Sequence, residues 1–73
     1  MTNVEIEAPT TGTVWKVECS NGARVHEGDV VLILESMKME IPVEVPVGGT
    51  VAALSVAPGD IVEEGQVLCV VQP

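Results

Sequence analysis

The sequence predicts an all-β protein in which two small antiparallel sheets pack face to face and are related by a pseudo-twofold axis. Three observations predict this fold: the chain of 73 residues repeats itself once, its strand-like runs are short and rich in Val and Thr, and Gly or Pro interrupts them every several residues. With one Trp and no Phe or Tyr, the core must consist of Val, Leu, Ile and Ala. We expect one domain spanning residues 1–73.

The repeat aligns residues 7–35 with residues 44–72 at a constant offset of 37, without a gap, and ten of the 29 pairs are identical. Three identical pairs are glycines: Gly12 and Gly49, Gly22 and Gly59, and Gly28 and Gly65. Glycine often marks a positive φ or a close approach of the backbone, so its retention indicates two copies of one fold. Copies this short cannot each enclose a core, so they must pack together.

The elements follow in the same order in each copy. Residues 13–19 alternate as a strand with Trp15, Val17 and Cys19 on one face, and we expect Trp15 to be partial core or edge cover. The matching residues of the second copy are Ala52, Leu54 and Val56. The copies then share turns at 20–23 and 57–60, turns of a second type at 25–29 and 62–66, and buried strands at 30–35 and 67–72.

The joint between the copies, residues 36–43, is predicted to be a turn at one end of the sandwich, with both termini at the other. The stretch ESMKMEIP is then a hairpin tip in solvent, with Lys38 near its apex and Met37 and Met39 bracing the turn. A lysine there is commonly a solubility device, and a methionine is commonly core filler. Exposed apolar neighbours at an apex, where Gly, Asn or Asp is usual, indicate instead a surface that another protein contacts.

Composition excludes several classes of partner. The net charge is −8, with eleven acidic residues against Lys16, Arg24 and Lys38. Nucleic acids and anionic membranes bind clustered cations, so neither is an expected partner. The acidic residues are interpreted as a solvated surface, and the alternative is that they face a basic docking surface on a partner. The longest apolar run, residues 30–34, is far short of the about 20 residues that span a membrane, and no signal peptide is recognisable, so we expect a cytoplasmic protein.

Patterns of catalytic residues are absent from the sequence. The single histidine, His26, lies in an acidic turn, and no Ser or Cys is spaced with a base. Cys19 and Cys69 are far apart and lack metal-ligand spacing, so we expect reduced, buried thiols. The sequence therefore predicts a non-catalytic protein without a metal site.

The residues at the tip carry a family resemblance. Residues 35–40, ESMKME, resemble the attachment motif of biotin carboxyl carrier domains, which is Ala/Ser-Met-Lys-Met preceded by Glu. The duplicated GTV…G…V.EG pattern is similar to the same biotinyl/lipoyl-attachment family, and the likeness runs over residues 4–71, closest to short free-standing biotin/lipoyl attachment proteins. It implies a barrel-sandwich hybrid, a flattened β-barrel of two four-stranded antiparallel sheets with the attachment lysine at a hairpin tip.

The resemblance implies that biotin is joined as an amide to Lys38, whose deprotonated amine attacks a biotinyl-adenylate held by a biotin protein ligase. Biotin on this arm would carry a carboxyl group between a biotin carboxylase and a carboxyltransferase, while the carrier itself catalyses no step. Met37 and Met39 match the flanking positions that distinguish a biotin site, and Glu35, Ser36 and Glu40 fill the rest of the motif. We expect the isolated carrier to be a monomer.

The match departs from the family in one turn, and two alternatives stay open. Many members have APMPG where this chain has APTTG at residues 8–12, a turn that should lie near the tip. Some larger carrier domains insert a segment called the thumb between their first strands, and the gapless repeat of this chain leaves no room for one. One alternative is a lipoyl carrier, although its motif typically has Asp and Ala at the positions of Met37 and Met39, so lipoate is less favoured than biotin. The other is an unmodified interaction module, which would not need Lys38.

Overall fold

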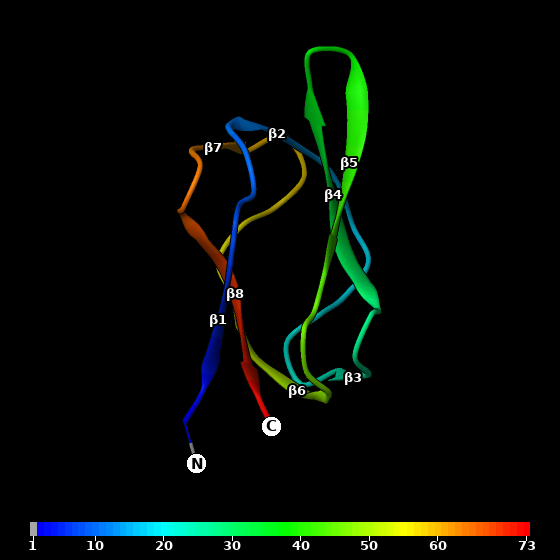
Figure 1. Cartoon of the computed structure of the whole chain (residues 1–73), viewed down its shortest axis with the longest axis vertical. Coiled ribbons are helices and arrows are strands. Elements are labelled where there is room, and N and C mark those ends of the chain that lie inside the picture. The colour runs from blue at the N-terminus through cyan, green and yellow to red at the C-terminus, as the bar shows by residue number, and fades with distance from the viewer. Residues whose placement is uncertain (1) are drawn as a thin grey trace.

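The computed structural model describes residues 2–73, which form eight β-strands and no helix (Figure 1). The strands are β1 (Val4–Glu7), β2 (Gly12–Val17), β3 (Arg24–Val25), β4 (Val30–Ser36), β5 (Met39–Glu44), β6 (Gly49–Leu54), β7 (Ile61–Val62) and β8 (Val67–Gln72). Within residues 2–73 they form two four-stranded antiparallel sheets, ordered β1-β8-β6-β3 (sheet A) and β5-β4-β2-β7 (sheet B). The predicted all-β fold is confirmed.

The two sheets are copies of one another at the offset of 37 residues found in the sequence. Adding 37 to the residue numbers of β2 and β3 gives β6 and β7, while β1 becomes residues 41–44 of β5 and β4 overlaps β8, so the strand order of one sheet becomes that of the other. Turn hydrogen bonds repeat as well: Gly22 N–H donates to the Val51 carbonyl, and Gly59 N–H donates to the Val14 carbonyl, both at 2.8 Å. The symmetry includes all of β1 and residues 41–44 of β5, beyond the start of the repeat seen in the sequence.

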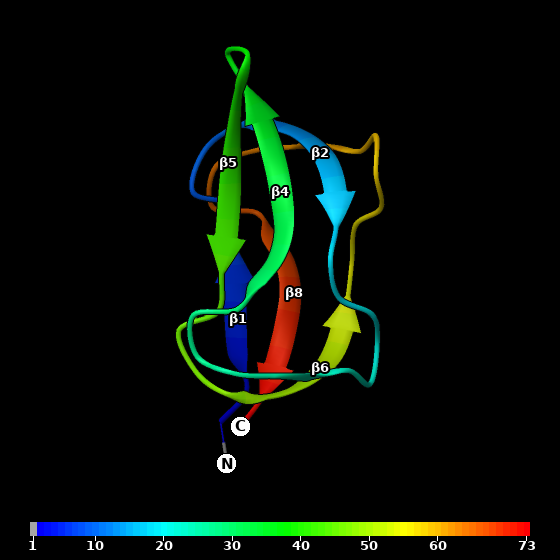
Figure 2. The ribbon, with the colours of Figure 1, turned by 90° about the vertical axis from the view of Figure 1, so that its right-hand side faces the viewer.

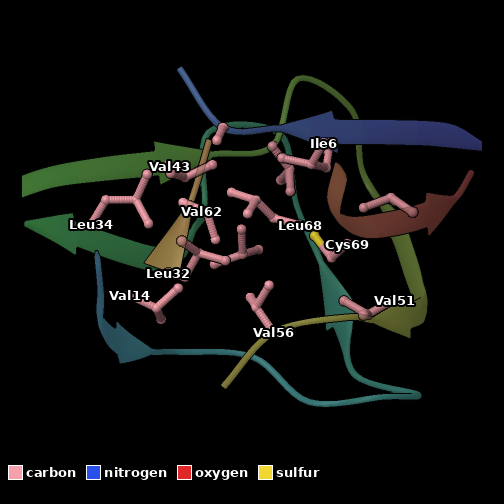
Figure 3. Close-up of a cluster of buried hydrophobic side chains, with 14 of the residues drawn as sticks. Ile6, Val14, Leu32, Leu34, Val43, Val51, Val56, Val62, Leu68 and Cys69 are labelled. Carbon is pink, nitrogen blue, oxygen red and sulfur yellow. The ribbon is translucent and has the colours of Figure 1, made fainter. Parts of the chain in front are cut away.

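The core lies between the sheets and consists of small aliphatic side chains (Figure 3). The largest fully buried side chains are Leu32, Leu34 and Leu68, and no polar or charged side chain of residues 2–73 is buried. Burying one such leucine stabilises the fold by about 1.5–3 kcal/mol. Cys69 is also fully buried and Cys19 is partly buried, and both are free thiols, as predicted.

The alternation predicted for residues 13–19 is wrong, because β2 contains a β-bulge. Its register with β4 shifts between Val14 and Lys16, which leaves Trp15 as an extra residue. Val14 is 1% exposed and Val17 packs against the core, whereas Trp15 is 49% exposed. Trp15 is therefore neither core nor edge cover: it lies on the outer face of an interior strand. The second copy has the same bulge at Ala52, so the matching alternation of residues 50–56 is wrong for the same reason.

The molecule is elongated, measuring 36 × 18 × 18 Å, because the hairpin of β4 and β5 projects beyond the rest of the sandwich (Figure 1, Figure 2). The hairpin lies at one end of the long axis, and the two termini lie at the other end, as the sequence predicts. The fold thus separates the tip from the core.

Candidate functional site

The projecting hairpin ends in a two-residue turn formed by Met37 and Lys38, and the last cross-strand pair beneath it is Ser36 with Met39. Met37 has a φ of 52° and Lys38 a φ of 63°. Positive φ at both central residues is the pattern of a type I′ turn, whose twist matches that of the two strands it joins. The structure therefore places Lys38 at the apex, where the sequence predicts it.

Neither residue of this turn is one that a type I′ turn favours. The usual pair is Asn-Gly, and the left-handed conformation costs other residues about 1–2 kcal/mol each. Among residues 2–73, Met37 and Lys38 are the only non-glycine residues with positive φ. Backbone strain of this kind is typical of functional positions. In this chain, one of the two strained residues is the lysine of the ESMKME motif.

The Lys38 side chain is exposed. The ion pairs within residues 2–73 are Lys16 with Glu18, at 3.1 Å, and His26 with Asp29, at 3.7 Å, so neither involves Lys38. Acylation of its amine would therefore break no ion pair within the described part of the chain. Lys16 is also exposed, but it is held in the middle of a strand beside its carboxylate partner.

Met37 and Met39 flank the lysine without packing against the domain. Met37 is 90% exposed and Met39 is 61% exposed. The expectation that they brace the turn is therefore wrong, since side chains this exposed make few contacts with the body. They instead offer flexible apolar surface on both sides of Lys38, a kind of surface that adapts readily to a binding partner.

The turn predicted at residues 8–12 to lie near the tip ends at Gly12, which lies against the base of the hairpin. A Cβ on Gly12 would lie 2.6 Å from the Glu35 carbonyl oxygen and 3.4 Å from the Ser36 Cβ. The Thr11 Oγ1 accepts a hydrogen bond from the Glu64 amide at 3.2 Å, which ties this turn to the turn between β7 and β8. Two elements far apart in the sequence thus meet beneath the tip.

Other candidate sites offer little chemistry. A groove of about 300 Å³ lies between β1 and β5, and none of residues 35–40 lines it. Residues 2–73 hold no cluster of three metal-ligating side chains, and they include no helix long and apolar enough to cross a membrane. Burial, and secondarily the neighbouring Cys19, raises the pKa of the Cys69 thiol to about 11, which disfavours the reactive thiolate. His26 is an exposed turn residue, as predicted.

The fold and the tip define a domain that presents one lysine at the end of a projecting hairpin. The family model described as "Biotin-requiring enzyme", which is the model of biotin/lipoyl domains, matches residues 4–71. The chain therefore belongs to the biotin/lipoyl attachment family. Family membership supports biotin as the cofactor of this class.

Relatives of the chain include much larger proteins. The chain is 53% identical over 38 residues to a putative urea carboxylase of Emericella nidulans, covering 52% of this chain and 3% of that protein. It is 46% identical over 39 residues to the biotinylated protein TB7.3 of Mycobacterium tuberculosis, covering 53% of this chain and 55% of that protein. The crystal structure of Kluyveromyces lactis urea carboxylase matches with a TM-score of 0.92 and 32% identity, over 99% of this chain and 6% of that chain.

Proposed function

We propose that this chain is a biotin carboxyl carrier in which biotin forms an amide with the Nζ atom of Lys38. The observation that carries the proposal is the position of Lys38: an exposed residue at the apex of a projecting hairpin, in a chain of the biotin/lipoyl attachment family. The similarity to urea carboxylases supports a role in carboxyl transfer. The tip suits a long covalent group, because no side chain of the body packs over Met37 beside the lysine.

Attachment requires that Lys38 enter the active site of a biotin protein ligase. The deprotonated Nζ attacks the carboxyl carbon of the biotinyl-adenylate; the C–N amide bond forms, the C–O bond to AMP breaks, and one proton is released. The hairpin projects beyond the rest of the sandwich, which presents the amine to the active site of the ligase (Figure 2). Met37 and Met39 offer the ligase apolar contacts on either side of Lys38. The shape and charge of the adjoining surface come from Glu35, Ser36 and Glu40.

The chain contributes reach to the later reaction, not catalysis. Bound biotin supplies the carboxyl-accepting and carboxyl-donating chemistry. Amide formation removes the lysine charge and lengthens the arm, and the carrier raises the local concentration of that arm at a biotin carboxylase and then at a carboxyltransferase. We propose that the carrier is a cytoplasmic monomer that docks on each of these enzymes in turn.

Biotinylation with purified biotin protein ligase, biotin and ATP tests the attachment site. The wild type and Lys16→Arg should be modified equally, and Lys38→Arg should give no signal on a streptavidin blot. A persistent signal from Lys38→Arg would show that the assignment is wrong. A lipoate protein ligase given the same chain tests the lipoyl alternative, which would be favoured if lipoylation were the faster reaction.

A further inference from the structure

The duplication supplies an internal comparison, because positions on sheet B have equivalents on sheet A. The large apolar side chains exposed within residues 2–73 all belong to sheet B or to its hairpin turn: Trp15, Val30, Met37, Met39 and Ile61. The sheet A equivalents of Trp15, Val30 and Ile61 are Ala52, Val67 and Arg24. Ala52 is small, Val67 is only partly exposed and Arg24 is charged. Two copies of one backbone therefore present different outer faces.

Part of the outer face of the sheet B body is apolar. Ile61 is 78% exposed and is the cross-strand partner of Thr13, and Trp15 follows Thr13 by two residues and points to the same side. Across β2, Ile33 lies opposite Lys16 and is itself the partner of Pro42. This surface, consisting of Thr13, Trp15, Ile33, Pro42 and Ile61 together with the exposed Lys16, is called the Trp15 face below.

The Trp15 face is continuous with the tip and becomes acidic where the two meet. Glu35 is the cross-strand partner of both Thr13 and Glu40. Like charges opposite one another destabilise a sheet, and the ion pairs within residues 2–73 include neither carboxylate. A partner that places Arg or Lys between these glutamates would relieve the repulsion. A partner that fits this surface would offer an apolar hollow for the Trp15 indole and, beside it, a basic rim of Arg or Lys that faces Glu35 and Glu40.

We propose that the Trp15 face is the docking surface for the biotin protein ligase, an inference that rests on the proposed function. A ligase that acts on Lys38 must lie along one side of the hairpin. The inner side is closed near its base, where Ser36 packs against Gly12. On the outer side, Glu35 lies beside Thr13, between the turn that holds Lys38 and the bulge that holds Trp15. Because Trp15 lies far from the reacting amine in the strand, docking there affects KM and leaves kcat unchanged.

Initial rates of biotinylation against carrier concentration, with purified ligase, test the proposal. The key variants are Trp15→Ala and the double variant Trp15→Ala/Ala52→Trp, which keeps the composition and moves the indole to the equivalent bulge of sheet A. Alanine suits this bulge, because the second copy has Ala52 there. We expect KM to rise by about fivefold or more in both variants, with kcat within about twofold of wild type. Ala52→Trp alone is the matched control and should keep the wild-type KM.

A second variant, Ile61→Arg, gives sheet B the residue that sheet A has at Arg24, at an exposed position where folding is not at risk. The added cation should repel the basic rim and raise KM, and added NaCl should raise the wild-type KM by screening Glu35 and Glu40. An unchanged KM in Trp15→Ala and Ile61→Arg, or recovery of KM in the double variant, would overturn the proposal.

Competition separates docking from attachment. Lys38→Arg cannot form the biotin amide but keeps the Trp15 face, so it should inhibit biotinylation of the wild type, whereas Lys38→Arg/Trp15→Ala should inhibit about fivefold less. Equal inhibition by the two competitors would contradict docking through Trp15. A wild type that the ligase does not modify would defeat the proposed function and this proposal together. A modified wild type with no effect of Trp15→Ala would defeat only the docking proposal.

Discussion

Gly12 lies directly against the backbone of Glu35, so that a Cβ on Gly12 would be 2.6 Å from the Glu35 carbonyl oxygen. The second copy has the same close approach between the equivalent residues, Gly49 and Gln72. In the first copy, the contact lies just below the tip that carries Lys38. The absence of a side chain at Gly12 therefore lets the start of β2 lie against the end of β4.

Gly12→Ala should destabilise the fold by about 1–3 kcal/mol, because the new methyl group must displace rigid backbone. For a domain of this size, each kcal/mol lowers the melting temperature by about 4–8 °C. Gly48→Ala is the matched control: its Cβ would come no closer than 3.4 Å to another atom, so its effect should be much smaller. Equal melting temperatures for the two variants, measured by circular dichroism, would contradict the close contact.

Met37→Asn should stabilise the fold by about 0.5–1 kcal/mol while slowing biotinylation. Asn adopts the left-handed conformation of Met37 at lower cost, but it removes an apolar contact for the ligase. The control is Met39→Asn, because Met39 lies in β5, where Asn relieves no strain. Thermal unfolding and initial modification rates measure the two effects separately. A Met37→Asn protein that melts at or below the wild-type temperature would mean that the turn is not strained.

The location of Lys38 could be predicted from the sequence because the repeat has no gap. Once residues 7–35 and 44–72 must form equivalent strands, the joint between them can only be a connection at one end, and Lys38 lies in it. The matched glycines also indicated positions of close approach, although the sequence could not show that Gly12 meets Glu35. That contact depends on the pairing of β2 with β4, which only the folded chain reveals.

The direction of Trp15 could not be predicted in the same way. A β-bulge shifts the alternation by one residue, and it arises from the register with a partner strand, not from the residues of its own strand. A strict alternation from residue 13 to residue 19 therefore put Trp15 on the wrong face. The exposure of Met37 and Met39 was predicted, but the expectation that they brace the turn was wrong, because the projecting hairpin removes them from the body.

Stability should fall as the pH rises from 9 to 11. Burial raises the pKa of the Cys69 thiol to about 11 from its ordinary value of 9.0, and burial also raises the pKa of Cys19. Across this pH window the unfolded chain loses thiol protons that the native chain keeps. The free energy of unfolding therefore falls by at most about 1.4 kcal/mol per pH unit for each thiol. Well below pH 9 both states keep their thiol protons, and the thiols add no pH dependence.

Urea unfolding of the wild type and of Cys69→Val, under reducing conditions at pH 8, 9, 10 and 11, checks this expectation. Lysines and the amino terminus titrate in the same range, so the difference between the two proteins isolates the thiol. The variant should lose less stability than the wild type on going from pH 9 to 11. Identical losses would show that ionisation of the Cys69 thiol is not linked to unfolding.

Moving the lysine by one position should preserve the fold and slow biotinylation by about tenfold or more. In Lys38→Met/Met39→Lys the composition is unchanged, but the amine moves from the turn to the first residue of β5, opposite Ser36. Successive residues of a hairpin present their side chains to different sides, so the amine would leave its orientation at the apex. Initial rates with purified ligase measure the effect. A rate equal to that of the wild type would mean that any exposed lysine near the tip suffices.

The most direct test of Lys38 as the biotin-carrying residue is the mass of the protein purified from the cell that naturally makes it. Intact mass spectrometry, followed by fragmentation of the peptide that spans residues 35–42, identifies both the group and its position. We expect one biotin amide per chain, located on Lys38. A bare Lys38, a lipoyl amide at this position, or biotin on Lys16 would contradict it.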